Sequence, residues 1–539
     1  MDWDAPEETR WSNTVAIALM KLPANVDITD PRYRGELFVD PGGPGASGVN
    51  FIKTLGDHLA SIVNDESVVF DIVGFDPRGI FRSMPRFSCF KAGNLQGRAI
   101  FAQKEGKGPW SERTLPIVWA RSAAFGQMCD PGNDTSEEAL IKYYMSTASV
   151  AADMIGFIEA SGARRAAQLD QMTASRGNEV DIERHKQLEY HPGQEKLQYW
   201  GFSYGTTLGG YFASMFPDKV ERMILDGSGY LPDWAEGKWM AFLTNIDESL
   251  RTLFTLCFTA GKKCALFDSA GPEAIESTVM SILGELKTNP IPIWGAEMIY
   301  PDVLTQEMVL ESMFTATYDP YRRYSGLAKA LYALQDRQNL NMTAISEFLP
   351  NQSIRSSDKD CASKDCAVED GNWYHEANVA VSCSDTDPYM HNRSFSVFAQ
   401  WSEDIHRQSR LFGHYFASDS TMACHGWPIR SRFRFDGPFG GKTSHPILFI
   451  GNSMDPMSPM ENMISGLDLF PGSGMVVTNS GGHCSPRVPS RCRSKHIGHY
   501  MRTGELPERG TICETDYAVF DEHAGANAAG HRRSAMFSV

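Results

Sequence analysis

The sequence feature that most constrains this chain is a Gly-x-Ser-x-Gly motif at residues 201–205, which directly follows the apolar run 197–200. A helical pattern at residues 206–216 comes next, and Pro217 stops it. A serine in this context is typical of a nucleophile elbow, a turn so tight that the residues two positions before and after it must be glycine. We therefore predict that Ser203 is a nucleophile, with its hydroxyl at the positive end of a helix. The alternative is an ordinary serine in a Gly-rich turn, because three fixed residues recur by chance.

Patterns typical of strands alternate with helical patterns along most of the chain. Several of the predicted strands are continuous apolar runs, which are typical of parallel strands buried on both faces of a sheet. The fold class is therefore predicted to be α/β, with a mostly parallel central sheet and helices on both faces. Strands are predicted at residues 11–22, 35–39, 68–75, 197–200, 222–227, 445–451 and 475–478, the last of these being the final strand.

Two further residues complete a candidate catalytic triad. Asp455 lies just beyond the predicted strand 445–451, and His483 lies just beyond 475–478. Open α/β sheets gather their sites at the carboxyl ends of strands, and the chain order Ser, Asp, His is one that serine hydrolases use. We predict Ser203 as nucleophile, His483 as base and Asp455 as its carboxylate partner. Asp226, at the end of another strand, is a rival for the acid.

A Gly-rich loop at residues 40–48 joins a predicted strand to a predicted helix. It lacks Gly-Lys-Ser/Thr and the dinucleotide-binding spacing, so a phosphate site is not expected. Its glycines would let the main chain approach a reacting carbonyl, and we predict the backbone N–H groups of Gly43 and Tyr204 as the oxyanion hole. Arg78 follows the strand 68–75; we expect a buried structural ion pair there rather than a catalytic role.

The alternation of strands and helices breaks between residues 232 and 431, which are rich in helical patterns and aromatic residues. An insertion of this kind between core strands indicates a cap over the active site. The predicted division is a core at 1–231, a mainly helical cap at 232–431, and the rest of the core at 432–539. The polar stretch 163–196 is expected to be a surface insertion.

Composition excludes several classes of function. A net charge of −16 argues against nucleic acid as a partner. No apolar run approaches the roughly 20 residues needed to cross a bilayer. Cysteines do not occur in the paired spacing of a zinc finger, and neither a metal nor an organic cofactor is expected.

Eleven cysteines suggest an oxidising compartment. Four Asn-x-Ser/Thr sequons, at Asn133, Asn341, Asn351 and Asn392, add support. The first residues lack the basic and apolar regions of a signal peptide. We therefore expect a secreted glycoprotein whose signal segment is absent from this chain; a cytosolic enzyme with scattered thiols is the alternative.

The motifs together resemble a known family. They are DPGGPGASG at 40–48, FDPRGIFRS at 75–83, YWGFSYGTTLG at 199–209, GNSMDPMSP at 451–459 and GGHCS at 481–485. In this order they resemble the α/β-hydrolase serine peptidases of the prolyl-aminopeptidase class, and more closely their secreted tripeptidyl-aminopeptidase-like branch. The resemblance implies an α/β-hydrolase fold and the same three triad residues, with the loop 42–45 serving the oxyanion. Asp40 departs from the pattern, since such enzymes often carry His or Asn there, and Phe81 replaces a usual small residue.

The resemblance also implies a disulfide framework that leaves Cys484, beside His483, as the odd thiol. The implied pairs are Cys89–Cys129, Cys257–Cys264, Cys361–Cys366, Cys383–Cys424 and Cys492–Cys513.

The expected activity is acyl transfer through a covalent serine, acting on a peptide near its free N-terminus. The cap should then offer carboxylates to the substrate ammonium, and the candidates are Glu236, Asp247, Glu248 and Asp385. The first alternative is an esterase, lactonase or amidase acting on a small hydrophobic metabolite, because the same triad serves ester and amide hydrolysis. A non-catalytic fold used for binding is the second alternative. The substrate and oligomeric state are not predicted.

Overall fold

The computed structural model describes residues 14–90, 114–130, 140–176, 188–294, 302–348, 373–391, 393–418 and 424–521. Its centre is an eight-stranded sheet in the order β1-β3-β2-β4-β5-β8-β9-β10. All neighbouring strands pair in parallel except β1, which is antiparallel to β3. The strands are β1 (Ala18–Leu22), β2 (Tyr33–Asp40), β3 (Val69–Asp76), β4 (Leu197–Phe202), β5 (Val220–Asp226), β8 (Ile447–Met454), β9 (Gly474–Gly481) and β10 (Ile512–Cys513).

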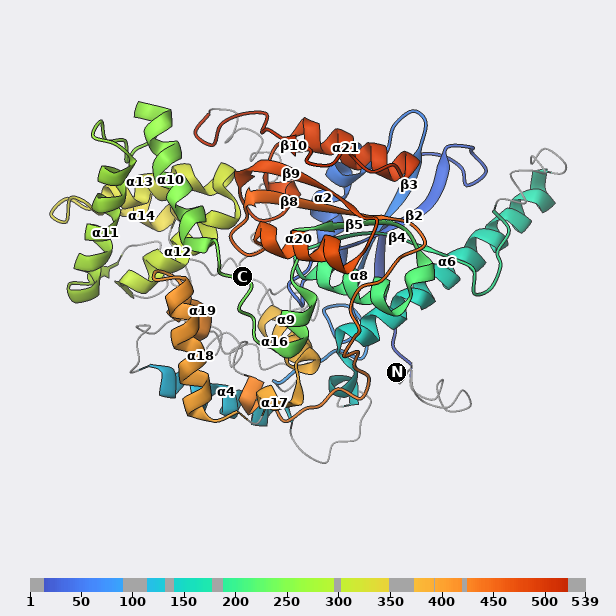
Figure 1. Ribbon diagram of the computed structural model, residues 1–539, viewed down its shortest axis with the longest axis horizontal. Helices are drawn as coiled ribbons and strands as arrows, with labels where there is room; N and C mark the ends of the chain where they lie inside the picture. The colour runs from blue at the N-terminus through green and yellow to red at the C-terminus, as the bar shows by residue number, and fades with distance from the viewer. Residues whose placement is uncertain are drawn as a thin grey trace.

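Helices cover both faces of the sheet, as predicted (Figure 1). The helices α2 (Gly48–Val63) and α21 (Arg491–Thr503) pack on one face, where Ile52 and Tyr500 join the apolar side chains of the sheet. The opposite face carries α6 (Thr147–Arg176), α8 (Tyr204–Met215) and α20 (Met460–Leu469). Because both faces are covered, the central strands are largely buried, and every residue of β4 is buried.

The helix ends follow from local sequence. Ser47 caps α2 by accepting the Asn50 N–H at 3.1 Å, and Ser490 caps α21 by accepting the Arg493 N–H at 3.3 Å. Hydroxyl acceptors at this position satisfy N–H groups that have no partner inside the helix. Gly504, at φ 77°, ends α21 in the left-handed conformation that glycine adopts without strain.

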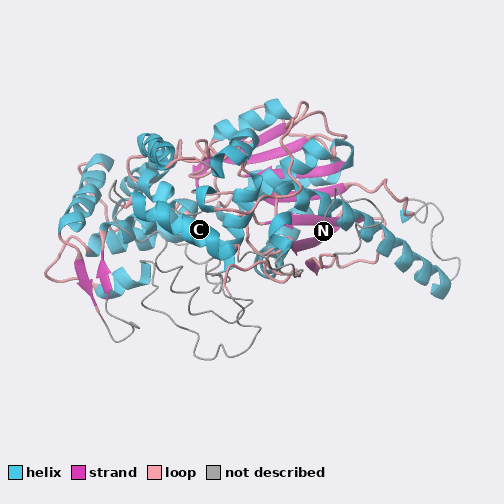
Figure 2. Ribbon diagram, turned by 90° about the horizontal axis from the view of Figure 1, so that it is seen from below, coloured by secondary structure: helices cyan, strands magenta, loops and turns pink. Residues whose placement is uncertain are grey.

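A long, mainly helical segment separates β5 from β8, although these two strands are hydrogen-bonded neighbours. Figures 1 and 2 show it beside and below the sheet, with the short hairpin of β6 (Ile291–Ile293) and β7 (Asp302–Leu304) at its far edge. Its helices are α9 (Leu231–Glu236), α10 (Ile246–Ala260), α11 (Pro272–Thr288), α12 (Gln306–Tyr318), α13 (Pro320–Ala333), α14 (Met342–Phe348), α16 (Trp373–Asp385), α17 (Pro388–His391), α18 (Phe395–Gln408) and α19 (Gly413–Ser418). We call this segment, residues 227–446, the insertion.

The sequence predictions for the sheet are confirmed with two corrections. The final strand is β10 rather than the segment at 475–478; it has only two residues, too short to give an alternating pattern. The stretch 163–196 is not simply a surface insertion, because its first part continues α6 as far as Arg176 and projects from the body of the molecule (Figure 1). The α4 helix (Leu115–Cys129) lies against the insertion, where Gly126 contacts Gly426.

The predicted disulfides that fall on described residues are all formed, and Cys484 is a buried free thiol. The Cys361–Cys366 pair lies outside the described residues. Among the helices that the structure describes, none is long and apolar enough to span a bilayer. The bonds are Cys89–Cys129, Cys257–Cys264, Cys383–Cys424 and Cys492–Cys513.

Candidate active site

Ser203 occupies the turn between β4 and α8 in the strained conformation that a nucleophile elbow requires. Its backbone angles are φ 54° and ψ −124°, a region that non-glycine residues rarely adopt. The two flanking glycines are needed for steric reasons. A Cβ on Gly201 would lie 2.3 Å from the carbonyl oxygen of Gly205, which leaves no room for a side chain. The prediction of a tight turn here is confirmed.

The elbow holds Ser203 at the edge of the buried core. Its N–H donates to the Asp226 carbonyl at 2.9 Å, which ties the elbow to the end of the neighbouring strand β5. Ser203 is half-buried, whereas Phe202 and Tyr204 on either side are buried. Ser203 is therefore the solvent-accessible residue of this turn.

His483 and Asp455 form a buried pair at the ends of β9 and β8. The imidazole Nδ1 lies 2.9 Å and 3.1 Å from the two carboxylate oxygens of Asp455, so this nitrogen carries the proton. The Asp455 side chain has no solvent exposure and His483 is 5% exposed, which keeps water from competing for this bond.

Backbone donors hold the Asp455 carboxylate in place. It accepts the N–H groups of Met457 at 3.0 Å, Ser458 at 2.8 Å and Cys484 at 3.1 Å. These bonds satisfy the buried carboxylate and fix its orientation toward the imidazole. The backbone N–H of His483 donates to the backbone carbonyl of Tyr318 at 2.9 Å. The insertion therefore also helps to set the position of this histidine.

The structure brings Ser203 and the His483 segment together around one carbonyl group. The Asp226 carbonyl that accepts the Ser203 N–H also accepts the thiol of Cys484 at 3.3 Å. Gly227 lies on the same side, and a Cβ there would be 3.5 Å from His483 Cε1 and 2.6 Å from Cys484 Sγ. Ser203 and the His483–Asp455 pair thus lie on either side of the Asp226 carbonyl, at the carboxyl edge of the sheet. Their joint action as a catalytic triad stays a prediction.

Asp226, the rival for the acid, has other partners. Its carboxylate accepts the Trp200 indole N–H at 3.2 Å and the Ser485 N–H at 2.8 Å, and no hydrogen bond to His483 is found among the described residues. Burial raises its pKa to about 6, against the lowering effects of Ser485 and Arg493. The hydrogen bonds of Asp226 therefore hold Trp200 and Ser485 rather than the imidazole of His483.

The thiol of Cys484 is enclosed beneath the elbow. Burial, together with the charges of Asp226 and Asp455, raises its pKa well above the ordinary range for cysteine. A thiol held in the protonated form is a poor nucleophile. Cys484 therefore packs and donates a hydrogen bond rather than competing with Ser203.

The predicted oxyanion loop lies against the elbow. A Cβ on Gly42 would be 2.9 Å from the Tyr204 nitrogen and 3.0 Å from Ser203 Cβ, so only glycine allows this approach. Gly42 and Gly43 have φ values of 93° and 116°, which favour glycine as well. Gly43 is half-buried and Gly42 is buried, so Gly43 is the one nearer to open space.

Helix α16 of the insertion covers this loop. The side-chain amide of Asn378 donates to the Pro44 carbonyl at 3.1 Å, and a Cβ on Gly43 would be 3.0 Å from the ring of Tyr374. Tyr374, which packs against the loop, and Tyr318, which contacts His483, therefore flank the candidate site. Sequence analysis missed both tyrosines, because the insertion has no strand periodicity that relates its residues to the sheet.

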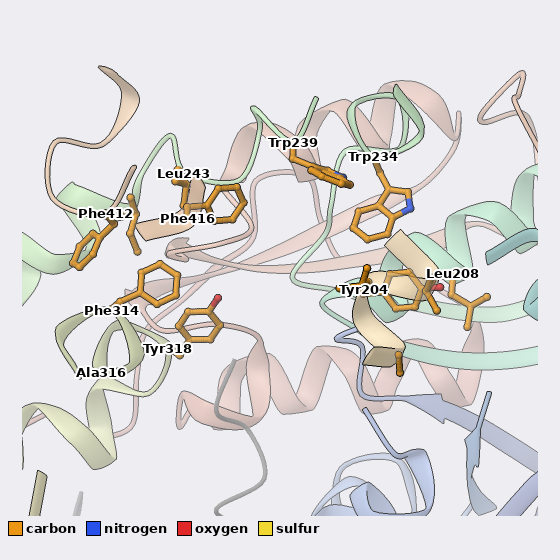
Figure 3. Close-up of a cluster of buried hydrophobic side chains, with 14 of the residues drawn as sticks. Tyr204, Leu208, Trp234, Trp239, Leu243, Phe314, Ala316, Tyr318, Phe412 and Phe416 are labelled. Atoms are coloured by element: carbon orange, nitrogen blue, oxygen red, sulfur yellow. The ribbon is translucent and has the colours of Figure 1, made fainter. Parts of the chain in front are cut away.

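Figure 3 shows two groups of buried aromatic side chains, one around Tyr318 and Phe314 and the other around Tyr204 and Trp234. In one group, the ring of Tyr318 lies 5.1 Å from the imidazole of His483 and 5.5 Å from the ring of Phe314. In the other group, the ring of Tyr204 lies 5.4 Å from Trp234. Aromatic rings thus pack against the imidazole of His483 and against Tyr204, the neighbour of Ser203.

The carboxylates predicted to bind a substrate ammonium already have partners. Asp385 is buried and accepts the Thr147 N–H at 2.7 Å, the Thr147 hydroxyl at 2.5 Å and the Trp234 indole N–H at 2.9 Å, and burial raises its pKa to about 6. The other three pair locally: Glu236 with Lys238, Asp247 with Ser409 and the Arg410 N–H, and Glu248 with Arg251.

Arg78 forms the predicted structural ion pair. Its guanidinium is 2% exposed and bonds both carboxylate oxygens of Asp153, with Nε 2.7 Å from Oδ2. In the described part of the chain, the group of side chains spaced to hold a metal is Cys492, His496 and Cys513. Two of these three are joined in a disulfide, so their sulfurs are not available as ligands.

Comparisons with known proteins agree with this architecture. Residues 37–243 match the family described as alpha/beta hydrolase fold, and residues 409–513 match the family described as TAP-like protein. Serine protease Hip1 from Mycobacterium tuberculosis is 29% identical over 521 residues, covering 95% of this chain and 85% of that protein. Tripeptidyl aminopeptidase from Streptomyces lividans is 23% identical over 496 residues, covering 90% of this chain and 78% of that protein. Carboxylesterase B from Mycobacterium tuberculosis is 38% identical over 89 residues, covering 16% of this chain and 15% of that protein.

Proposed function

Because this chain is an α/β-hydrolase of the TAP-like serine peptidase family, and hence a serine hydrolase, we propose that it is an aminopeptidase that releases short peptides or single residues from a peptide N-terminus. The proposed catalytic residues are Ser203, His483 and Asp455. The observation that carries the proposal is the buried bond from His483 Nδ1 to Asp455, at 2.9 Å, beside an elbow whose serine has a strained backbone.

In the proposed mechanism, the Ser203 hydroxyl attacks the carbonyl carbon of the scissile amide while His483 Nε2 takes its proton. Asp455 keeps the other imidazole nitrogen protonated and stabilises the imidazolium. The negative charge on the carbonyl oxygen is held by the N–H groups of Gly43 and Tyr204; one such donor is worth roughly 3 kcal/mol of barrier.

The tetrahedral intermediate then collapses. The carbon–nitrogen bond breaks, and His483 gives its proton to the leaving amine. Water, with His483 again as base, hydrolyses the ester to Ser203 and restores the free enzyme. This chain's own side chains and backbone are sufficient for every step.

Residues 232–431, which make up most of the insertion, are proposed to act as a cap between the two parts of the core, 1–231 and 432–539. Support comes from its contacts on both sides of the site, through Tyr318 at His483 and Tyr374 at Gly43. Closing the site with apolar rings would exclude water from the acyl-enzyme and strengthen the electrostatic interactions inside.

The first experiment tests the nucleophile. Wild-type protein should be labelled by a fluorophosphonate probe, and the Ser203→Ala variant should lose both labelling and hydrolysis. Ser228→Ala is a matched control, because Ser228 is a buried serine just beyond the end of β5. Hydrolysis that survives in folded Ser203→Ala protein would defeat the proposed chemistry.

The second experiment tests the substrate class. Peptidyl p-nitroanilides of one to three residues are compared with a free and with an acetylated N-terminus. An aminopeptidase should cleave the free forms and discriminate strongly against the acetylated ones, because an ammonium-binding site cannot be satisfied by an amide. Equal cleavage of both forms would contradict the aminopeptidase assignment.

A second candidate function is hydrolysis of an ester, lactone or amide of a small hydrophobic metabolite. The aromatic rings that pack against His483 and against Tyr204, and the short match to carboxylesterase B, favour it. Activity on aryl esters alone, with no cleavage of any peptidyl anilide, would support this function over the first.

We also propose that the protein acts in the secretory pathway or outside the cell. The disulfides support this, since they persist in oxidising compartments, and so does the exposed sequon at Asn341. The other three sequons lie outside the described residues. A mass shift on treating secreted protein with a glycosidase, absent from an Asn341→Gln variant, would locate a glycan at this position.

A further inference from the structure

Asp40 places a buried carboxyl group beneath the Gly-rich loop. It is the last residue of β2 and is 1% exposed. Its Oδ1 accepts the N–H of Gly42 at 2.8 Å. Gly42 directly precedes Gly43, the first proposed oxyanion donor, so this hydrogen bond fixes the chain that leads into the donor.

The same carboxyl group also contacts the elbow. A Cβ on Gly205 would lie 2.6 Å from the backbone oxygen of Asp40 and 2.9 Å from its Oδ1. Gly205 directly follows Tyr204, the second proposed donor. The Asp40 carboxyl group therefore lies between the two segments that carry the oxyanion donors, and it supports both.

The titratable groups around Asp40 come from three elements, β3, β4 and α8. Asp76 on β3 is the acid that acts on it, and Asp76 is itself bonded to Ser47 and lies 4.0 Å from Arg82. The charge of Asp40 also acts on the phenols of Tyr199 on β4 and Tyr204 on α8. Both phenols stay neutral, because burial raises the pKa of each well above the ordinary value for tyrosine.

Burial raises the pKa of Asp40 to about 7; the Gly42 N–H opposes this shift and the charge of Asp76 adds to it. The carboxyl group therefore changes its protonation within the working range of an enzyme. In the neutral form its carbonyl oxygen still accepts the Gly42 N–H. In the ionised form it adds a negative charge close to the point where the oxyanion develops, and like charges in a buried site repel strongly.

We propose that Asp40 is a positioning residue with two separable effects: its carboxyl oxygen holds the oxyanion loop, and its negative charge slows acyl transfer. The enzyme is then most active when Asp40 is neutral. This inference rests on the oxyanion hole assigned under Proposed function, and it holds for ester and amide substrates alike.

The decisive variant is Asp40→Asn, which keeps an acceptor oxygen and removes the charge. Hydrolysis of a p-nitrophenyl ester is followed from pH 5 to pH 9. Wild-type kcat should fall on the alkaline side, with a midpoint near pH 7 and a loss of about tenfold, because Asp40 ionises there. The Asp40→Asn variant should lose this alkaline limb.

A second variant separates the two effects. Asp40→Ala removes both the charge and the acceptor of the Gly42 N–H, so it should lack the alkaline limb and have a kcat about tenfold below that of Asp40→Asn at every pH. KM should change little in either variant, because the oxyanion contacts form in the transition state.

Two results would overturn the inference: a wild-type profile that stays flat from pH 7 to pH 9, or an Asp40→Asn profile that superimposes on a declining wild-type profile. Ser203→Ala distinguishes this failure from that of the proposed function. If Ser203→Ala is inactive and Asp40→Asn still follows wild type, only the role of Asp40 is wrong.

Discussion

Two buried aspartates at neighbouring strand ends have different hydrogen-bond partners in this molecule. Asp455 contacts the imidazole of His483, and Asp226 contacts Trp200 and Ser485. Both follow apolar strands, so sequence pattern alone left both open as the triad acid. The difference comes from partners that are far away in the chain, and only the assembled sheet places them.

The first prediction separates these two aspartates. Asp455→Asn should lower kcat by about 10⁴ with little change in KM, because the amide favours the wrong imidazole tautomer. Asp226→Asn should keep kcat within about threefold of wild type, since its side chain does not touch His483. Ester hydrolysis measures both, and thermal unfolding of each variant confirms that it is folded. A larger loss of kcat in folded Asp226→Asn than in Asp455→Asn would reverse the assignment.

The geometry of the nucleophile elbow depends on five consecutive residues, 201–205. Its strand, its two glycines and its helix were predicted from sequence because each depends on neighbours within the same short segment. Sequence analysis could not find β10, which has two residues. It also could not place Tyr318 and Tyr374, since their contacts depend on the path of the insertion in space.

The second prediction tests the steric demand of the elbow. Gly205→Ala should destabilise the protein by about 1–3 kcal/mol and reduce activity, because its Cβ would lie 2.6 Å from the Asp40 carbonyl oxygen. Gly156→Ala is the control: Gly156 is exposed on α6, and a Cβ added there would have no heavy atom within 4 Å. That change should stabilise by about 0.5–1 kcal/mol. Urea unfolding measures both, and equal effects would contradict the argument.

The third prediction concerns the disulfides as connections between elements. Cys89–Cys129 spans 40 residues and Cys257–Cys264 spans 7. Because a longer closed loop restricts the unfolded chain more, removing the first bond should cost about 1.5 kcal/mol more than removing the second. All four cysteines are buried, so the cavity left by Cys→Ala is similar in each double variant. The free energies of unfolding of the two double variants test the order, and a larger loss in Cys257→Ala/Cys264→Ala would contradict it.

At the scale of the whole molecule, buried acids whose pKa is raised give an unusual dependence of stability on pH, and Asp40, Asp226 and Asp385 show the largest shifts. Burial raises the pKa of Asp40 to about 7 and those of Asp226 and Asp385 to about 6. Each folded-state pKa lies above the unfolded value of about 3.9. Their stabilising contribution is therefore complete below about pH 4 and is lost as pH rises through 6 to 7.

The fourth prediction follows from this loss of stability with rising pH. Between pH 5 and pH 8 the free energy of unfolding should fall by about 3 kcal/mol, after allowing for His391. Burial lowers the pKa of His391 to about 4, so this residue acts in the opposite direction between pH 5 and its unfolded value of about 6.5. Asp40→Asn removes the largest contribution and should make the dependence nearly flat. Denaturant unfolding at several pH values measures the slope; a wild-type protein that gains stability from pH 5 to pH 8 would contradict the prediction.

The position of the insertion also has a consequence for biosynthesis. On the ribosome, β5 emerges long before its neighbour β8, because everything between Asp226 and Ile447 must be translated first. At about 5–20 residues per second, this delay lasts roughly ten to forty seconds. During that time the nascent protein presents an apolar strand edge with unpaired backbone groups, which is a site for aggregation. Recombinant yield should therefore respond to chaperones that bind such edges more than to any change in the mature site.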